Sequence, residues 1–238
     1  NNLSQGRPRM STTNDGPRVS VVMSVYNGES QLERTIDSIL QQTLQDFEFV
    51  IVNDGSTDSS LQILRRYQQQ DSRVKVIDQH NQGLTRALNS GCEAASGEMI
   101  ARQDVGDISL PQRLEKQLAA LDADSRIVAV GVSCRRVGPG GEYLGDLVRD
   151  LSPEQITEAL WDHGTGLMHA SCAYRSDTFR TIGGYRPEFR FAQDTDLWYR
   201  LANIGLLAQL PDVMFEVLIE AAGISGRQIE KQIQLANL

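Results

Sequence analysis

The segment Glu98-Met-Ile-Ala-Arg-Gln-Asp-Val-Gly-Asp-Ile-Ser109 decides the fold. Its first half is an apolar run typical of a buried strand, and two carboxylates, Asp104 and Asp107, follow that run directly. Ligands of open α/β sheets bind outside the carboxyl ends of the strands, so this acid pair marks a candidate site. The alternative is a plain strand-to-helix turn, because Asp and Gly are common turn residues.

Similar strand and helix units precede this segment. Residues 19–25 and 47–52 are predicted strands, each followed by a helical apolar period, and the second ends close to Asp54. Residues 74–77 form a third predicted strand before another helix. Strands that alternate with helices predict an α/β fold with a mostly parallel central sheet, flanked by helices and joined by right-handed crossovers.

The second half of the chain predicts elements of both kinds. The turn signal Gly138-Pro-Gly-Gly141 within residues 135–148 indicates a hairpin or flap. The other predicted elements are a helix opened by Pro111, a strand over 127–132, a short helix from Ser152, a strand over 167–174 that holds His169, and a helix with Asp194 and Asp196 in its first turn.

The domain organisation follows from these elements. We expect residues 1–17 to form a flexible arm, because they are polar and lack an apolar period. Residues 18–212 are predicted to form a single domain. Residues 213–238 are predicted to form a C-terminal extension that ends in an amphipathic helix.

Composition excludes several classes of protein. The chain has 238 residues and a formal charge of -8, which argues against sequence-independent nucleic-acid binding. Its three cysteines are widely spaced and indicate neither a disulfide framework nor a zinc site, and no apolar run is long enough to span a membrane. A cytoplasmic protein is expected. Almost all positive charge is on arginine, which suits bidentate phosphate or carboxylate contacts.

Motifs of other nucleotide enzymes and hydrolases are absent from the sequence. There is no Gly-x-Gly-x-x-Gly after the first strand, no Walker lysine loop, no Gly-x-Ser-x-Gly and no His-Glu-x-x-His. Asp54 and Asp104 still predict a nucleotide crevice at two strand ends, with Arg86 or Arg102 facing a diphosphate. Solvated loop acids are the alternative.

Seven short blocks resemble, in order, the family-2 glycosyltransferases with the GT-A fold, over roughly residues 18–212. The blocks are Val19-Ser-Val-Val-Met-Ser-Val-Tyr-Asn27, Val52-Asn-Asp-Gly-Ser-Thr-Asp58, Gly83-Leu-x-x-Ala-Leu-Asn89, Ala101-Arg-Gln-Asp104, Pro111-x-Arg-Leu114, Gly183-Gly-Tyr-Arg186 and Gln193-Asp-x-Asp-Leu-Trp198. The resemblance implies inverting transfer of a sugar from a nucleotide-sugar donor, UDP-sugars being common, to an acceptor hydroxyl on a carbohydrate or lipid-linked acceptor.

The resemblance also implies roles for particular residues. Residues 18–107 would bind the nucleotide, with Ser24 and Asp54 at the nucleobase and Asp104 at the ribose or diphosphate. Residues 108–212 would bind the acceptor.

On the acceptor side, Asp194 would be the general base, with helix N-terminal capping as its alternative. His169, Gln193 and Trp198 would lie at the acceptor, although His169 could instead be a hydrogen-bonded core histidine.

The sequence departs from the family pattern at the metal position. The usual metal-binding aspartate is replaced by Gly106, and Glu220 and Ala221 stand near the place where many relatives have a histidine. Asp107 or Glu220 could still bind Mg²⁺ or Mn²⁺, because hard cations prefer oxygen ligands. Otherwise arginines supply the charge, or activity is lost.

Three functions therefore stay open. They are an active glycosyltransferase, a degenerate protein that binds nucleotide sugars without turnover, and another nucleotide-dependent enzyme such as a nucleotidyltransferase. The third lacks support, because no glycine-rich loop follows the first strand. Contact with a membrane surface from the cytoplasmic side and the oligomeric state stay open.

Overall fold

The computed structural model describes residues 16–164, 166–189 and 192–219. The amino-terminal half alternates strands and helices, as the sequence predicts. Its elements are β1 (Val19–Val25), α1 (Glu29–Leu40), β2 (Phe47–Asp54), α2 (Ser60–Gln70), β3 (Val74–Gln79), α3 (Leu84–Ala94), β4 (Met99–Gln103) and β5 (Ile108–Ser109).

The second half is more varied. Its elements are α4 (Arg113–Ala123), β6 (Ile127–Val137), β7 (Tyr143–Leu147), α5 (Pro153–His163), the 3-10 helix η1 (His169–Ser171), β8 (Ala173–Arg175), α6 (Ser176–Thr181), α7 (Gln193–Ala202) and β9 (Leu206–Leu218). The hairpin expected around Gly138 is present as β6 and β7. Ser152 begins α5 with a reciprocal capping box to Gln155.

One prediction of secondary structure is wrong. The apolar run over 167–174 was expected to be a strand that holds His169, but His169 begins η1 and the strand starts only at Ala173. The backbone N–H of Ser171 donates to the carbonyl of Met168 and closes a tight turn in place of a strand.

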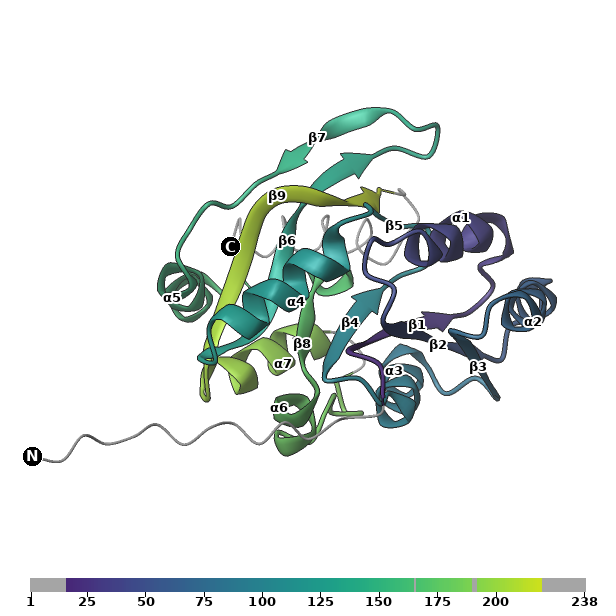
Figure 1. Ribbon diagram of the computed structural model, residues 1–238, viewed down its shortest axis with the longest axis horizontal. Coiled ribbons are helices and arrows are strands. Elements are labelled where there is room, and N and C mark those ends of the chain that lie inside the picture. The colour runs from purple at the N-terminus through teal and green to yellow at the C-terminus, as the bar shows by residue number, and fades with distance from the viewer. Residues whose placement is uncertain (1–15, 165, 190–191, 220–238) are drawn as a thin grey trace, which may run out of the picture.

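The described strands form one mixed sheet in the order β3-β2-β1-β4-β8-β6-β9-β5, with β7 paired to the outside of β6 (Figure 1). The first four strands are parallel, which confirms the mostly parallel α/β sheet. The short strand β8 runs antiparallel between β4 and β6 and joins the two halves of the chain in one sheet.

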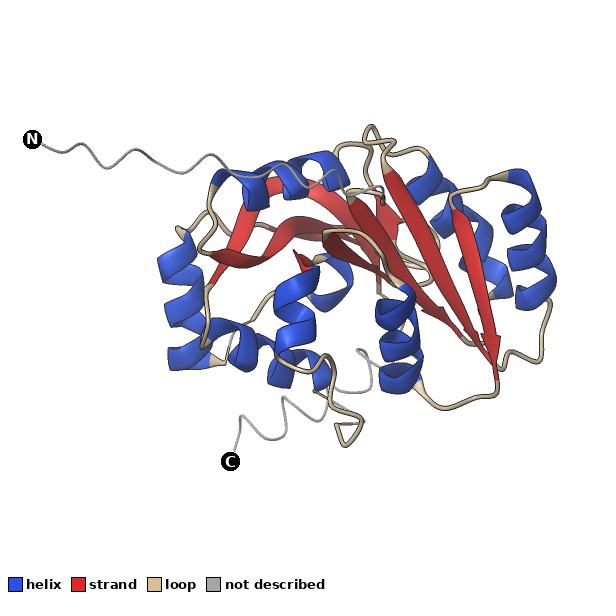
Figure 2. Cartoon of the chain, turned by 60° about the horizontal axis from the view of Figure 1, so that its bottom comes forward, coloured by secondary structure: helices blue, strands red, loops and turns tan. Residues whose placement is uncertain are grey.

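Helices cover both faces of this sheet, as Figure 2 shows. On one face α1, α2 and α4 bury Leu32, Leu64 and Leu118 against the strands. On the other, α3, α5, α6 and α7 contribute residues such as Leu88 and Leu197. Since both faces are covered, the open edge at the carboxyl ends of the parallel strands is where a ligand can reach.

The predicted outer segments lie mainly outside the described residues. This applies to residues 1–15 of the expected arm and to the amphipathic helix expected after residue 220. Strand β9 runs across the boundary expected at residue 212, because Val213 pairs with Ser133 of β6.

Candidate active site

Three predicted donor residues lie at one edge of the sheet. Ser24 is near the end of β1, Asp54 ends β2, and Asp104 directly follows β4. The register pairs Met23 with Gln103 and Val25 with Asn53, so Asp54 and Asp104 flank the end of β1. Two strand spacings separate them, roughly 10 Å.

The carboxylate of Asp54 is engaged by the protein. It accepts hydrogen bonds from Nε2 of Gln79 at 2.7 Å and from the backbone N–H groups of Gln82 and Gly83 at 2.9 and 2.8 Å. The residue is 2% exposed. Asp54 therefore holds the loop that leads into α3, where the sequence suggested a direct nucleobase contact.

Arg86 lies on the exposed side of the same loop. It lines an open cavity of about 580 Å³, together with Gln82, Gly83 and Pro187. The hydroxyl of Thr85 donates to the carbonyl of Phe189 at 2.9 Å and ties α3 to the later segment. The cavity is thus bordered by both halves of the chain.

Arg102 is placed differently from the expectation. It was expected to face a diphosphate, but it is fully buried and its guanidinium contacts Asp104 at 2.5 Å. It also donates to the carbonyl of Val22 at 2.8 Å. Arg102 holds the Asp104 carboxylate from its buried side. The rest of the Asp104 side chain, which is 41% exposed, is accessible to solvent.

A second buried arginine supports the loop from 104 to 107, and the sequence analysis did not assign it a role. Arg113 donates to the carbonyl of Arg102 at 2.6 Å and to the hydroxyl of Ser109 at 2.8 Å. Gln103 donates to the carbonyl of Asp107 at 2.9 Å. The available signal was the block Pro111-x-Arg-Leu114, whose arginine shares the buried face of α4 with Leu114, Leu118 and Leu121.

His169 is the point at which several segments meet. Its Nε2 lies 2.7 Å from the hydroxyl of Tyr185 and accepts from Nε of Arg102 at 3.4 Å. Its ring lies edge-on to Trp198, with centroids 6.1 Å apart. Burial first, and then the positive Arg102, lower the pKa of His169 to about 4, while the carboxylates of Asp104 and Asp194 act in the opposite direction. The ring is therefore neutral at physiological pH.

Asp194 and Asp196 differ sharply although both lie in the first turn of α7. Asp196 is buried against Arg186 at 3.3 Å and Arg200 at 2.6 Å and is a structural ion pair. Asp194 is partly exposed, and its Oδ1 accepts from the backbone N–H of Thr195 at 2.9 Å. Among the described side chains no cation pairs with Asp194, so its carboxylate is the one available for chemistry.

The other predicted acceptor residues are mostly enclosed. Gln193 is 8% exposed and Trp198 is 2% exposed, packed beside His169. Among the residues that the structure describes, the indole N–H of Trp198 finds no hydrogen-bond partner. Of the expected acceptor set, Asp194 and His169 keep partly exposed surface.

Tyr185 is a site residue to which the sequence analysis gave no role. Its hydroxyl connects His169 to Tyr174, 3.0 Å away. Asn89 holds its backbone with two hydrogen bonds, of 2.8 and 3.1 Å. The two sequence blocks that contain Asn89 and Tyr185 thus contact each other in the fold. The sequence alone does not show this contact.

The predicted metal ligands do not form a metal site in the described part of the chain. Gly106 has no side chain, and Asp107 is 7% exposed with its Oδ1 accepting from the N–H of Leu218 at 3.0 Å. Burial, and then the nearby Asp104, raise the pKa of Asp107 well above its ordinary value, which opposes an anionic ligand. Within residues 16–164, 166–189 and 192–219, no three His, Cys, Asp or Glu side chains gather as a metal site would require. Glu220 lies outside the described residues.

Among the described helices, none combines the length and the apolar character needed to cross a bilayer.

Comparison with known proteins gives a consistent result. The model of the family described as "Glycosyl transferase family 2" matches residues 20–183. EpsE of Bacillus subtilis (strain 168) is 34% identical over 230 residues, covering 94% of this chain and 81% of EpsE. The amylovoran biosynthesis glycosyltransferase AmsE of Erwinia amylovora is 32% identical, with 92% and 84% covered.

Solved structures share the fold at low sequence identity. The mannosyltransferase PcManGT from Pyrobaculum calidifontis, in complex with GDP-Man and Mn²⁺, superposes with a TM-score of 0.70 at 20% identity, covering 91% of this chain and 61% of that one. TarS 1-349 of S. aureus, in complex with UDP-GlcNAc, gives a TM-score of 0.70 at 19% identity, with 92% and 66% covered. The chain thus spans about two thirds or less of these solved chains.

Proposed function

This chain belongs to glycosyl transferase family 2 and is a glycosyltransferase with a GT-A-like fold, and on that premise we propose inverting transfer from a nucleoside-diphosphate sugar to an acceptor hydroxyl. The names of AmsE, for amylovoran biosynthesis, and of WbnJ from Escherichia coli, for O-antigen biosynthesis, support a polysaccharide or glycoconjugate product. The complexes of TarS with UDP-GlcNAc and of PcManGT with GDP-Man support a nucleotide sugar as donor. These two donors differ in both the nucleobase and the sugar.

One observation carries this proposal. Arg102 contacts both Asp104, which follows β4, and His169, and the ring of His169 packs against Trp198, one turn after Asp194 in α7. These contacts bring close together two segments whose carboxylates are 90 residues apart in the sequence. A donor-side acid and an acceptor-side base are the two groups that a direct displacement needs.

The roles follow from burial and partners. Asp104 is anchored by Arg102 and presents its outer surface to the ribose or diphosphate of the donor. Ser24 borders the nucleobase position, Asp54 shapes the loop around it, and Arg86 extends the site along α3. These donor roles are inferred from position along the sheet edge.

Asp194 is proposed as the general base. It takes the proton of the acceptor hydroxyl as that oxygen attacks the anomeric carbon, and the bond from this carbon to the diphosphate breaks with both electrons leaving on the phosphate oxygen. Neutral His169 stands between the two acids and carries no charge that would pair with Asp194. His169 and Trp198 would shape the acceptor side.

The expected Mg²⁺ or Mn²⁺ is supported by the Mn²⁺ complex of PcManGT. The residues of this chain fit such an ion poorly, because Asp107 is buried with a raised pKa and Gly106 has no ligand atom. We therefore assign no step of the reaction to a cation.

The proposal is tested with a panel of UDP- and GDP-sugars, with either Mn²⁺ or EDTA. The expected result is binding of at least one donor and release of its nucleoside diphosphate, faster with a suitable acceptor. If no donor binds and none is hydrolysed, the proposed function is wrong.

A second candidate is a protein that binds nucleotide sugars without turnover. The observation in its favour is Gly106 at the usual metal position. Donor binding without hydrolysis or transfer, under both ion conditions and with every acceptor tried, would support this candidate over catalysis.

A further inference from the structure

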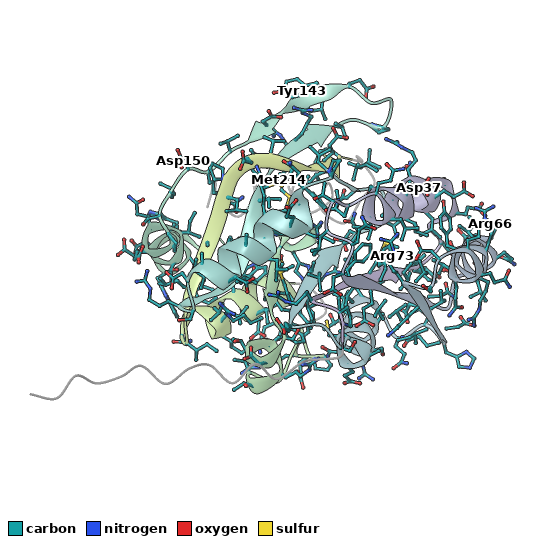
Figure 3. All side chains as sticks on the ribbon, in the orientation of Figure 1. Asp37, Arg66, Arg73, Tyr143, Asp150 and Met214 are labelled. Atoms are coloured by element: carbon teal, nitrogen blue, oxygen red, sulfur yellow. The ribbon has the colours of Figure 1, made fainter. Side chains whose placement is uncertain are left out.

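A separate cavity of about 440 Å³ lies beside the loop from 104 to 107, between α1 and the β6–β7 hairpin. Gly106 and Leu218 line it near the sheet, and the turn that contains Pro139 lines it from the hairpin. Tyr143 stands at the outer margin of the molecule, as Figure 3 shows, and is 64% exposed. The volume is within the range of small-ligand sites.

The polar character of the cavity comes chiefly from two arginines. Arg135 is already engaged, with Asp146 at 3.3 Å, Glu216 at 3.7 Å and the ring of Tyr143 at 5.7 Å. Arg34 of α1 is exposed and has neither an ion pair nor a hydrogen bond within the described ranges. An uncommitted guanidinium beside a cavity can receive a bidentate anion.

Gly106 lies both in the lining of this cavity and next to the proposed donor site in the sequence. A Cβ built on Gly106 would lie 3.2 Å from Cδ2 of Leu218, so this position faces the cavity wall. Gly106 is only two residues from Asp104, the proposed donor contact. Gly106 and Arg34 line the same cavity, which therefore begins two residues from Asp104 in the sequence.

Charge gives the cavity its selectivity. The whole chain carries -8, so an anion needs a local cation to overcome the general repulsion. Arg34 supplies that cation, whereas the carboxylate of Glu216 in the same lining is paired with Arg135 at 3.7 Å.

We propose that this cavity is an anion-binding subsite in which Arg34 binds the diphosphate of the nucleotide-sugar donor. The inference depends on the proposed function. It assigns to an arginine the positive charge beside the diphosphate that a metal ion would supply if position 106 carried the usual aspartate. The same chemistry would suit the carboxylate of an acidic acceptor sugar, so the experiment separates these two sources.

The test compares Arg34→Gln with Arg65→Gln, a matched control on an exposed face of α2 that is remote from the cavity lining. Calorimetry in EDTA measures the Kd of UDP, GDP, uridine and guanosine for the full chain. We expect Arg34→Gln to weaken binding of the preferred diphosphate about tenfold, with nucleoside binding unchanged. Arg65→Gln should match the wild type.

Glu216→Gln provides a test of opposite sign. It removes the carboxylate that pairs with Arg135, which leaves the cavity lining more positive, and should tighten diphosphate binding by about threefold. Thermal melting of each variant checks that the fold is intact, so a loss of affinity is not a loss of folded protein.

The second arm measures binding of glucuronate and glucose by NMR. Loss of glucuronate binding in Arg34→Gln, with diphosphate affinity unchanged, would retain the anion subsite but overturn the diphosphate as its ligand. No change in either arm would overturn the subsite. A wild type that binds no nucleotide would instead contradict the proposed function. Binding of glucuronate would then still show whether the cavity is an anion-binding subsite.

Discussion

The hydroxyl of Tyr185 lies 2.7 Å from Nε2 of His169 and ties the Gly183–Tyr185 turn to this ring. Arg102 can only donate to the same nitrogen, so Nε2 is the acceptor and the phenol donates to it. A hydrogen bond of this kind favours the neutral ring. Tyr185 is therefore a positioning residue for His169.

Tyr185→Phe should raise the pKa of His169 above about 4, because the neutral ring loses a hydrogen-bond donor, although burial and Arg102 still lower that pKa. We expect kcat to fall several-fold with KM nearly unchanged. NMR titration of the histidine and steady-state kinetics measure the two effects. Tyr174→Phe is the control, because that hydroxyl contacts Tyr185 and not His169. Equal titration in both variants would contradict the assigned role.

The lowered pKa of His169 predicts how stability depends on pH. The unfolded chain binds a proton at about 6.5 and the folded chain only at about 4, so the unfolded state is favoured as pH falls through this window. The contribution of this one group falls by at most about 3 kcal/mol between pH 6.5 and 4. Denaturant unfolding of wild type and His169→Asn should show a smaller loss in the variant. An identical loss would show that His169 is not held neutral.

Asp194→Asn should abolish transfer, by at least about a hundredfold, while the Kd of the donor changes less than about threefold. The reason is that a base acts on the acceptor and the donor is bound elsewhere. Activity assays and donor calorimetry measure these effects. If donor binding disappears as well, Asp194 has a different role.

Asp196→Asn is the informative contrast on the same helix turn. It breaks two ion pairs of a largely enclosed carboxylate, one with the largely enclosed Arg200 and one with the exposed Arg186, and should lower the free energy of unfolding by roughly 2 kcal/mol. Asp194→Asn should leave the melting temperature within a degree or two. Equal destabilisation by both would contradict the division between a structural and a chemical carboxylate.

Gly106→Ala should destabilise the fold more than Gly183→Ala. Both glycines have positive φ, of 97° and 82°, so both substitutions carry backbone strain of roughly 1 kcal/mol. At Gly106 the new Cβ would also meet Leu218 at 3.2 Å, whereas no described atom lies within 4 Å of a Cβ at Gly183. Urea denaturation measures the difference, and equal losses would show that Leu218 moves freely.

Much of the sheet edge is predictable from the sequence. An apolar run followed by an acid gives a buried strand and a carboxylate at its end, which places Asp104 correctly after β4. The helical periods after β1, β2 and β3 likewise gave the helices that cover the two faces. These features depend on local pattern alone, which is why one sequence is sufficient.

The contacts within the site are less predictable. Arginines are rarely buried, so the local sequence does not predict that Arg102 is buried beside Asp104. The run over 167–174 is apolar enough for a strand, yet the turn at Met168 and the contact with Tyr185 decide its shape. Such choices depend on partners far away in the chain.

The interleaved sheet has a consequence for how the molecule comes apart. Strand β8, from the second half, fills the place between β4 and β6, and Asn89 grips the backbone of Tyr185 across the same junction. Neither half can melt without exposing the flank of the other. Heating should therefore give one calorimetric peak, and fragments cut near residue 107 should not persist as separate folded pieces.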